Sequence, residues 1–245
     1  MSRAKSVLLS LVVVLVVGVV MVSSASGAIS FVWKVGGAEL KAGESKGYTI
    51  NNDGKIFDLT WSIAGVAVLM LSNKIKVEPG AKIIGGKPGT NEETVVFENV
   101  TVDNPAGCTV ESLPEPVVGI VRTRPLLTLI VEGQSGGRGN GEPLILFEPK
   151  EGTTFTTMRF LNATGKTCPV NLAEGSIEGN ILGLPLPQKT EVVQGNLVFE
   201  SVTKEYLVAS GGVVRTAGLK FAGNTVTLTG LTLVLLESGQ AFGAF

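Results

Sequence analysis

The sequence of 245 residues contains no histidine. A Ser-His-Asp hydrolase needs an imidazole base, so this absence excludes that mechanism. Two Gly-x-Ser-x-Gly matches, centred on Ser45 and Ser135, therefore lack a catalytic partner, and neither opens a helical pattern. A zinc site would have to be completed by carboxylates, which is uncommon. We expect no catalytic residue, no metal site and no cofactor.

An excess of charge is also missing, and aromatic residues are scarce. The 20 basic and 21 acidic residues nearly balance, which argues against nucleic acid or an anionic membrane surface as a partner. Two Trp and two Tyr are few for the aromatic girdles of an outer-membrane β-barrel, although the terminal Phe245 is typical of that class. The outer-membrane barrel therefore stays an alternative.

The first 30 residues, "MSRAKSVLLSLVVVLVVGVVMVSSASGAIS", have the pattern of a secretory signal peptide. Two basic residues precede an apolar segment over 7–22, and the small residues Ser26 and Ala28 occupy the positions that a signal peptidase requires. We expect cleavage between Ala28 and Ile29, which makes residues 1–28 the signal peptide. The alternative is an uncleaved anchor, but a membrane span needs about 20 apolar residues.

Cleavage leaves residues 29–245, which is the size of a single all-β domain. Cys108 and Cys168 are the only cysteines. In an exported chain two cysteines most often form one disulfide, because the compartment lets that bond form and persist. We expect a Cys108–Cys168 disulfide, with a free or metal-binding thiol pair as the alternative.

Beyond the leader, apolar residues alternate with polar ones in many short runs separated by Gly, Pro, Asn and Asp. This pattern predicts an all-β fold, a single antiparallel sandwich or a partly closed barrel. Asn52–Gly54 suits a tight hairpin turn between two strands. In "NTVTLTGLTLVLL" the apolar face switches at Gly230, which indicates a bulge or a bend. The glycine-rich segment 132–143 is typical of an exposed, flexible loop.

The stretch "NATGKTCPV", residues 162–170, contains Gly-Lys-Thr at 165–167, the sequence that ends a phosphate-binding loop. That loop requires an earlier glycine at position 160, where Phe160 stands, and a helix where Pro169 stands. The stretch therefore predicts a turn after a strand, held in place by its cysteine.

Paired carboxylates are the remaining enzymatic option, because a glycosidase needs only two acids across a cleft. The sequence does not say which acids converge. The candidates are Glu92, Glu93, Glu98, Glu148, Glu151, Glu174 and Glu178.

Several stretches together resemble a group of uncharacterised secreted proteins from soil actinobacteria. They are "GAKIIGGKPGTNEETVVFENVTV", "GCTVES", "VRTRPLLTLIVEG", "LILFEPKEGTTFTTMRF", "TCPV" and "TLTGLTLVLLESGQAFG". The resemblance covers most of the exported chain and implies an exported, disulfide-containing β fold. The group has no assigned activity, so no functional residue is implied.

We therefore expect an exported, non-catalytic protein with a binding or structural role outside the cell or in its envelope. Its partner would be a cell-surface component or a small apolar ligand, and it would meet the membrane only during export. One alternative is a carrier that encloses a small apolar ligand in a β-barrel. A carbohydrate-active enzyme with paired carboxylates and an outer-membrane β-barrel also stay open.

Overall fold

The computed structural model describes residues 31–135, 138–200, 205–208 and 213–245. Within these ranges every regular element is a β-strand, which confirms the expected all-β class. In the same ranges no helix has the length and apolarity to cross a membrane. The expected signal peptide and its cleavage flank at Ser26, Ala28 and Ile29 lie outside the described residues.

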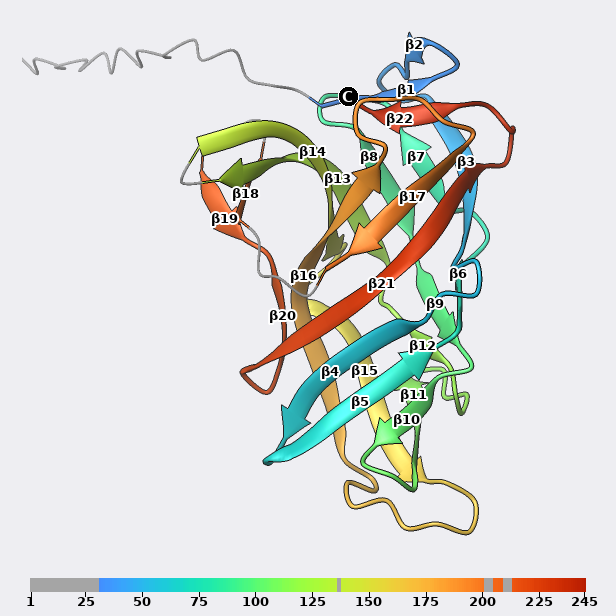
Figure 1. Cartoon of the computed structure of the whole chain (residues 1–245), viewed down its shortest axis with the longest axis vertical. Helices are drawn as coiled ribbons and strands as arrows, with labels where there is room; N and C mark the ends of the chain where they lie inside the picture. The colour runs from blue at the N-terminus through green and yellow to red at the C-terminus, as the bar shows by residue number, and fades with distance from the viewer. Residues whose placement is uncertain (1–30, 136–137, 201–204, 209–212) are drawn as a thin grey trace, which may run out of the picture.

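Eight antiparallel strands close into a ring, called here the upper barrel (Figure 1). Closure depends on β17, which pairs with β16 on one side and β21 on the other. Around the ring the strands are β3 (Ser45–Asn51), β7 (Lys82–Ile84), β8 (Thr90–Glu93), β13 (Leu126–Ser135), β14 (Arg138–Pro149), β16 (Glu174–Leu186), β17 (Gln194–Phe199) and β21 (Asn224–Leu236).

Strands β16 and β21 extend beyond this ring into a second curved sheet, called here the lower sheet (Figure 1). Its order is β10-β5-β4-β21-β20-β16-β15-β11, and its two ends, β10 and β11, lie beside each other. The added strands are β4 (Phe57–Ile63), β5 (Val66–Ser72), β10 (Thr101–Asn104), β11 (Cys108–Leu113), β15 (Thr154–Asn162) and β20 (Gly218–Phe221).

Two small sheets and the strand pair β18 and β19 complete the fold. One sheet, in the order β2-β1-β22, lies at the upper end of the upper barrel in Figure 1. The other has the order β12-β9-β6, and β18 pairs with both β13 and β19. These strands are β1 (Trp33–Val35), β2 (Ala38–Glu39), β6 (Lys74–Val77), β9 (Val95–Glu98), β12 (Val121–Arg122), β18 (Glu205–Leu207), β19 (Val214–Thr216) and β22 (Phe242–Ala244).

Strands β13 and β14 are buried on both faces, which explains their continuous apolar runs "LLTLIVEG" and "LILFEP". Leu126 and Ile130 belong to the cluster that fills the interior of the molecule. The residues of opposite parity pack in a second cluster on the outer side of the wall. That outer cluster comprises Val131, Leu144, Leu146, Leu182, Tyr206 and Ala217.

The turn at Asn52–Gly54 forms as expected, with positive φ angles of 45° at Asp53 and 69° at Gly54. The expected hairpin is wrong, however, because β3 and β4 do not pair with each other. Both strands pair with β21: the first half of β21 pairs with β4, and its second half pairs with β3. The turn therefore carries the chain along β21, from the part of that strand in the upper barrel to the part in the lower sheet.

Gly230 marks the place on β21 where the strand changes partners. Residues before it pair with β4, and residues after it pair with β3. A Cβ atom at Gly230 would collide with the Phe57 ring, so only glycine lets that ring pack against the strand. The expected bend thus coincides with the junction of the two curved sheets.

The loop expected over 132–143 is wrong. Most of this segment continues β13 and β14 as a paired hairpin, with Gln134 opposite Gly139. Its glycines suggested a break, but pairing with the neighbouring strand outweighs their weak intrinsic preference for a strand.

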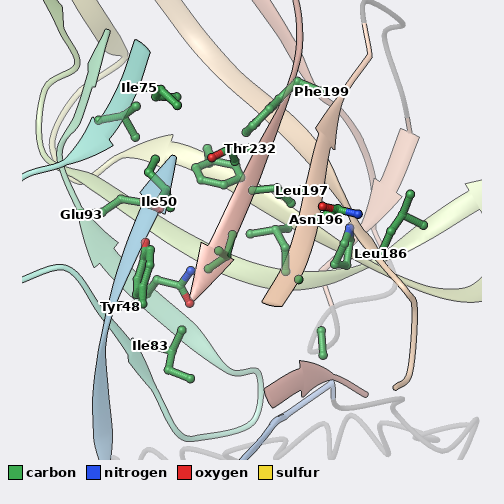
Figure 2. Close-up of a pocket in the computed structure, with 18 of the residues that line it drawn as sticks. Tyr48, Ile50, Ile75, Ile83, Glu93, Leu186, Asn196, Leu197, Phe199 and Thr232 are labelled. Atoms are coloured by element: carbon green, nitrogen blue, oxygen red, sulfur yellow. The ribbon is translucent and has the colours of Figure 1, made fainter. Parts of the chain in front are cut away.

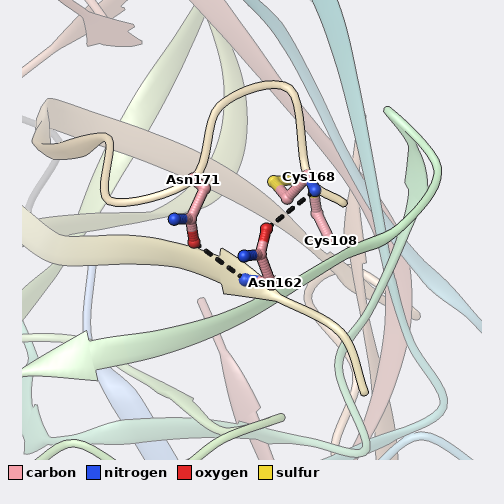
Figure 3. The surroundings of a disulfide bond; sticks show 4 residues. All are labelled: Cys108, Asn162, Cys168 and Asn171. Atoms are coloured by element: carbon pink, nitrogen blue, oxygen red, sulfur yellow. Dashed lines mark hydrogen bonds between the residues drawn. A yellow bond between two sulfur atoms is a disulfide. The ribbon is translucent and has the colours of Figure 1, made fainter. Parts of the chain in front are cut away.

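The expected disulfide is confirmed between Cys108, at the start of β11, and Cys168, in the turn after β15 (Figure 3). The Asn162 side chain accepts a hydrogen bond of 2.8 Å from the backbone N–H of Cys168. The Asn171 side chain accepts one of 2.9 Å from the backbone N–H of Asn162. "NATGKTCPV" is therefore a turn, as expected. The bridge spans 60 residues, and the loop-entropy account assigns about 4 kcal/mol to such a closure.

Candidate functional site

The upper barrel surrounds an apolar cavity, because alternate side chains along each strand point inward. Its volume, measured as the space that the centre of a water molecule can occupy, is about 80 Å³. One water needs about 10–15 Å³ by this measure, so the cavity has room for roughly five to eight non-hydrogen atoms. The aliphatic lining includes Ile50, Ile83, Leu126, Ile145, Ile181 and Leu197, each from a different strand.

The cavity reaches the surface at the segment that joins β16 to β17. The lining residues Leu186, at the end of β16, and Pro187 and Thr190, on this segment, are solvent-exposed. Trp33 and Phe242 of the small end sheet line the cavity as well, and their ring centroids are 6.4 Å apart. The cavity is therefore open to solvent beside these residues.

Five buried residues with polar side-chain groups other than Trp33 interrupt the apolar lining: Tyr48 of β3, Asn91 and Glu93 of β8, Thr123, and Thr232 of β21. Figure 2 shows Tyr48 and Glu93 on one side of the cavity and Leu186 and Asn196 on the opposite side. Asn91 donates a hydrogen bond to the Tyr48 oxygen, and the Tyr48 hydroxyl donates one to the Glu93 carboxylate. Within the described ranges the Oδ1 atom of Asn91 and the Oε1 atom of Glu93 have no hydrogen-bond partner.

Burial controls the ionisation of this group. It raises the pKa of Glu93 to about 7, against the opposing effect of the hydrogen bond from Tyr48. Burial, followed by the nearby Glu93 carboxylate, raises the pKa of Tyr48 well above its ordinary value. Near neutral pH the polar end of the cavity therefore contains a neutral phenol and a half-ionised carboxyl group.

A second cavity of about 40 Å³ lies between the lower sheet and the sheet of β6, β9 and β12. The Phe57 and Phe97 rings, 5.6 Å apart, meet edge to face in its wall. Four residues line both cavities, so the two spaces share a wall: Phe97, Thr123, Phe155 and Leu228.

Of the seven acids considered as catalytic pairs, Glu93 alone lines the cavity in the upper barrel. Glu92 and Glu98 each form ion pairs with two lysines, whose hydrogen bonds lower the pKa of both carboxyl groups. The structure thus does not bring two of these acids together in the cavity. The remaining four, Glu148, Glu151, Glu174 and Glu178, lie elsewhere on the strands and turns.

Ser45 and Ser135, the centres of the two Gly-x-Ser-x-Gly matches, lie within strands β3 and β13. Neither is at a turn from a strand into a helix, the position that the hydrolase motif requires. In the described ranges no group of three or more Cys, Asp or Glu side chains is placed to hold a metal ion.

Sequence reasoning missed Tyr48 and Asn91 and did not distinguish Glu93 from the other acids. A usable signal was present in "NEETVVF", where Asn91 and Glu93 have the same parity as Val95 and Phe97. All four of these residues line the cavity. Polar residues in step with apolar ones along an extended chain indicate a polar group on the buried face.

No protein-family model, curated protein or solved structure matches the chain. Its function therefore has to be inferred from the site itself.

Proposed function

We propose that this chain is an exported, non-catalytic binding protein that carries a small apolar molecule inside its upper barrel. The observation that carries the proposal is the apolar cavity within a closed ring of eight strands, with an opening beside Leu186. Closed antiparallel barrels of this size either fill their interior or hold one small ligand. The space left here fits the second use.

Export is supported by the signal-peptide pattern of residues 1–28 and by the Cys108–Cys168 disulfide. A disulfide of this kind persists in oxidising compartments. We therefore place the protein outside the cell or at its surface.

The lining favours a carrier over an outer-membrane barrel and over a carbohydrate-active enzyme. Outer-membrane barrels have a polar lumen behind an apolar outer wall, whereas here the lumen is mainly apolar. A carbohydrate-active enzyme needs two facing acids, and of the seven candidates only Glu93 lines the cavity.

A variant that fills the cavity tests the proposal. Gly195 lines the cavity, and a Cβ atom there would meet its nearest neighbour, Phe242, at an ordinary 3.5 Å. Gly195→Leu should therefore fold and occupy the space near the opening. The matched control is Gln194→Leu, the same side chain at the exposed neighbouring position.

Calorimetric titration with 1-hexanol, a probe of suitable size, should show saturable binding to the wild type and to Gln194→Leu. Gly195→Leu should lose it, because its side chain takes the place of the ligand. Equal binding to all three proteins, or none to the wild type, would contradict the proposal. Thermal unfolding without ligand confirms that each variant is folded.

A further inference from the structure

The polar end of the cavity has a defined hydrogen-bonding capacity. Asn91 uses its amide N–H to bond Tyr48, and Tyr48 uses its only O–H to bond Glu93. When Glu93 is ionised, two acceptor atoms remain without a partner among the described residues: Oδ1 of Asn91 and Oε1 of Glu93, on side chains that are 6 % and 8 % exposed. Burying polar atoms without partners costs free energy, so a ligand that donates to both atoms would gain by satisfying them.

The geometry limits which head group can do this. Asn91 and Glu93 are two residues apart on β8, so both side chains point to the same face of the strand. A carboxylate head group has no hydrogen to donate, and an alcohol has one. An ammonium group has three hydrogens, which is enough to donate to both oxygens.

The lack of a positive charge near Glu93 in the described part of the chain also favours an ammonium head group. Among the residues that the structure describes, no lysine or arginine contributes to the pKa of this carboxyl group. The neighbouring strands present Tyr48 of β3, Ile83 of β7, Val95 of β9 and Leu126 of β13 to the cavity. Tyr48 is the titratable residue among them, so an ionised Glu93 has no positive partner among the residues that line the described cavity.

We propose that the ligand of the upper barrel is a small apolar primary amine, with its ammonium group bound between Glu93 and Asn91. The apolar part of the ligand lies against the aliphatic lining, in a space of about 80 Å³. This inference rests on the carrier function proposed above and adds the chemical class of the ligand.

The amine should bind in a pH-dependent way. Burial raises the pKa of Glu93 to about 7 in the empty cavity, and the ammonium pairs with the ionised form. Amine affinity should therefore rise as the pH passes through about 7 and level off above it. An alkyl ammonium keeps its proton until roughly pH 10, as lysine does. Binding of an uncharged ligand should change much less with pH.

The test compares hexylamine with 1-hexanol, which share the same chain length, by calorimetric titration at pH 5.5 and pH 8. At pH 8 the wild type should bind hexylamine at least about tenfold more tightly than hexanol, since a close buried charge pair contributes by at least this factor. Glu93→Gln, which keeps the size of the side chain, should abolish this preference and retain hexanol binding. Glu92→Gln, a surface change at the adjacent residue, should behave like the wild type.

The outcomes separate the two proposals. If the wild type binds hexanol as tightly as hexylamine at pH 8, or if Glu93→Gln keeps the amine preference, the amine assignment is wrong and the carrier function stands. If hexanol does not bind the wild type, the carrier proposal itself fails.

Discussion

The buried carboxyl group of Glu93 makes the stability of the empty protein depend on pH in a specific direction. In the native state its pKa is about 7, against an ordinary value of 4.5. Between these values the unfolded chain has released the proton and the folded chain still holds it. Unfolding is therefore increasingly favoured as the pH rises through this interval. The penalty is absent below pH 4.5 and complete above pH 7, where it amounts to roughly 3 kcal/mol.

Glu93→Gln removes the titrating group while keeping its shape. We expect its free energy of unfolding, relative to the wild type, to increase by about 3 kcal/mol between pH 4 and pH 8. The comparison uses the change with pH, so any constant effect of the amide cancels. Urea unfolding followed by tryptophan fluorescence at several pH values measures it.

Glu92→Gln is the matched control. Hydrogen bonds from Lys150 and Lys82 lower the pKa of Glu92, so its contribution is present above the unfolded pKa and is lost as the pH falls. This variant should therefore change in the opposite direction, and by less, because the Glu92 side chain is 35 % exposed and solvent screens its ion pairs. Parallel wild-type and Glu93→Gln curves from pH 4 to pH 8 would refute the assignment of a protonated, buried Glu93.

Two further predictions concern the rest of the molecule. Gly230→Ala should lower the free energy of unfolding by about 2 kcal/mol, because the new methyl group collides with Phe57. Gly218→Ala is the control: its methyl group would lie in open space, so the free energy of unfolding should hardly change in the same urea experiment. Intact mass spectrometry of protein recovered from outside the expressing cells should show the loss of residues 1–28 and a deficit of two hydrogens for the Cys108–Cys168 bond. A retained leader or two free thiols would contradict the proposed export and oxidation.

Strand class, the disulfide and the turn at "NATGKTCPV" could be predicted because each depends on local signals. Alternation and turn residues mark strands, and two cysteines in an exported chain leave one pairing. Partner choice could not be predicted in the same way. Asp53 and Gly54 specify a turn, but not that both flanking strands join β21.

The site was harder to predict than the fold because it depends on closure of the barrel. Glu93 differs from Glu92 only in parity, and parity indicates burial only once the inner face of the ring is known. The contact between Tyr48 and Glu93 joins segments about 45 residues apart in the chain. No local pattern specifies such a contact.

The sharing of β16 and β21 has a consequence for how this molecule folds. Each strand is hydrogen-bonded within both the upper barrel and the lower sheet, so detaching either one opens both at once. Cutting the chain so that the upper barrel and the lower sheet are separated would divide β16 and β21. Each part would then keep only a fragment of both strands. We expect one cooperative unfolding transition. We also expect slow folding, because β3 pairs with β21, and Asn51 and Thr232 on these strands are 181 residues apart in the sequence.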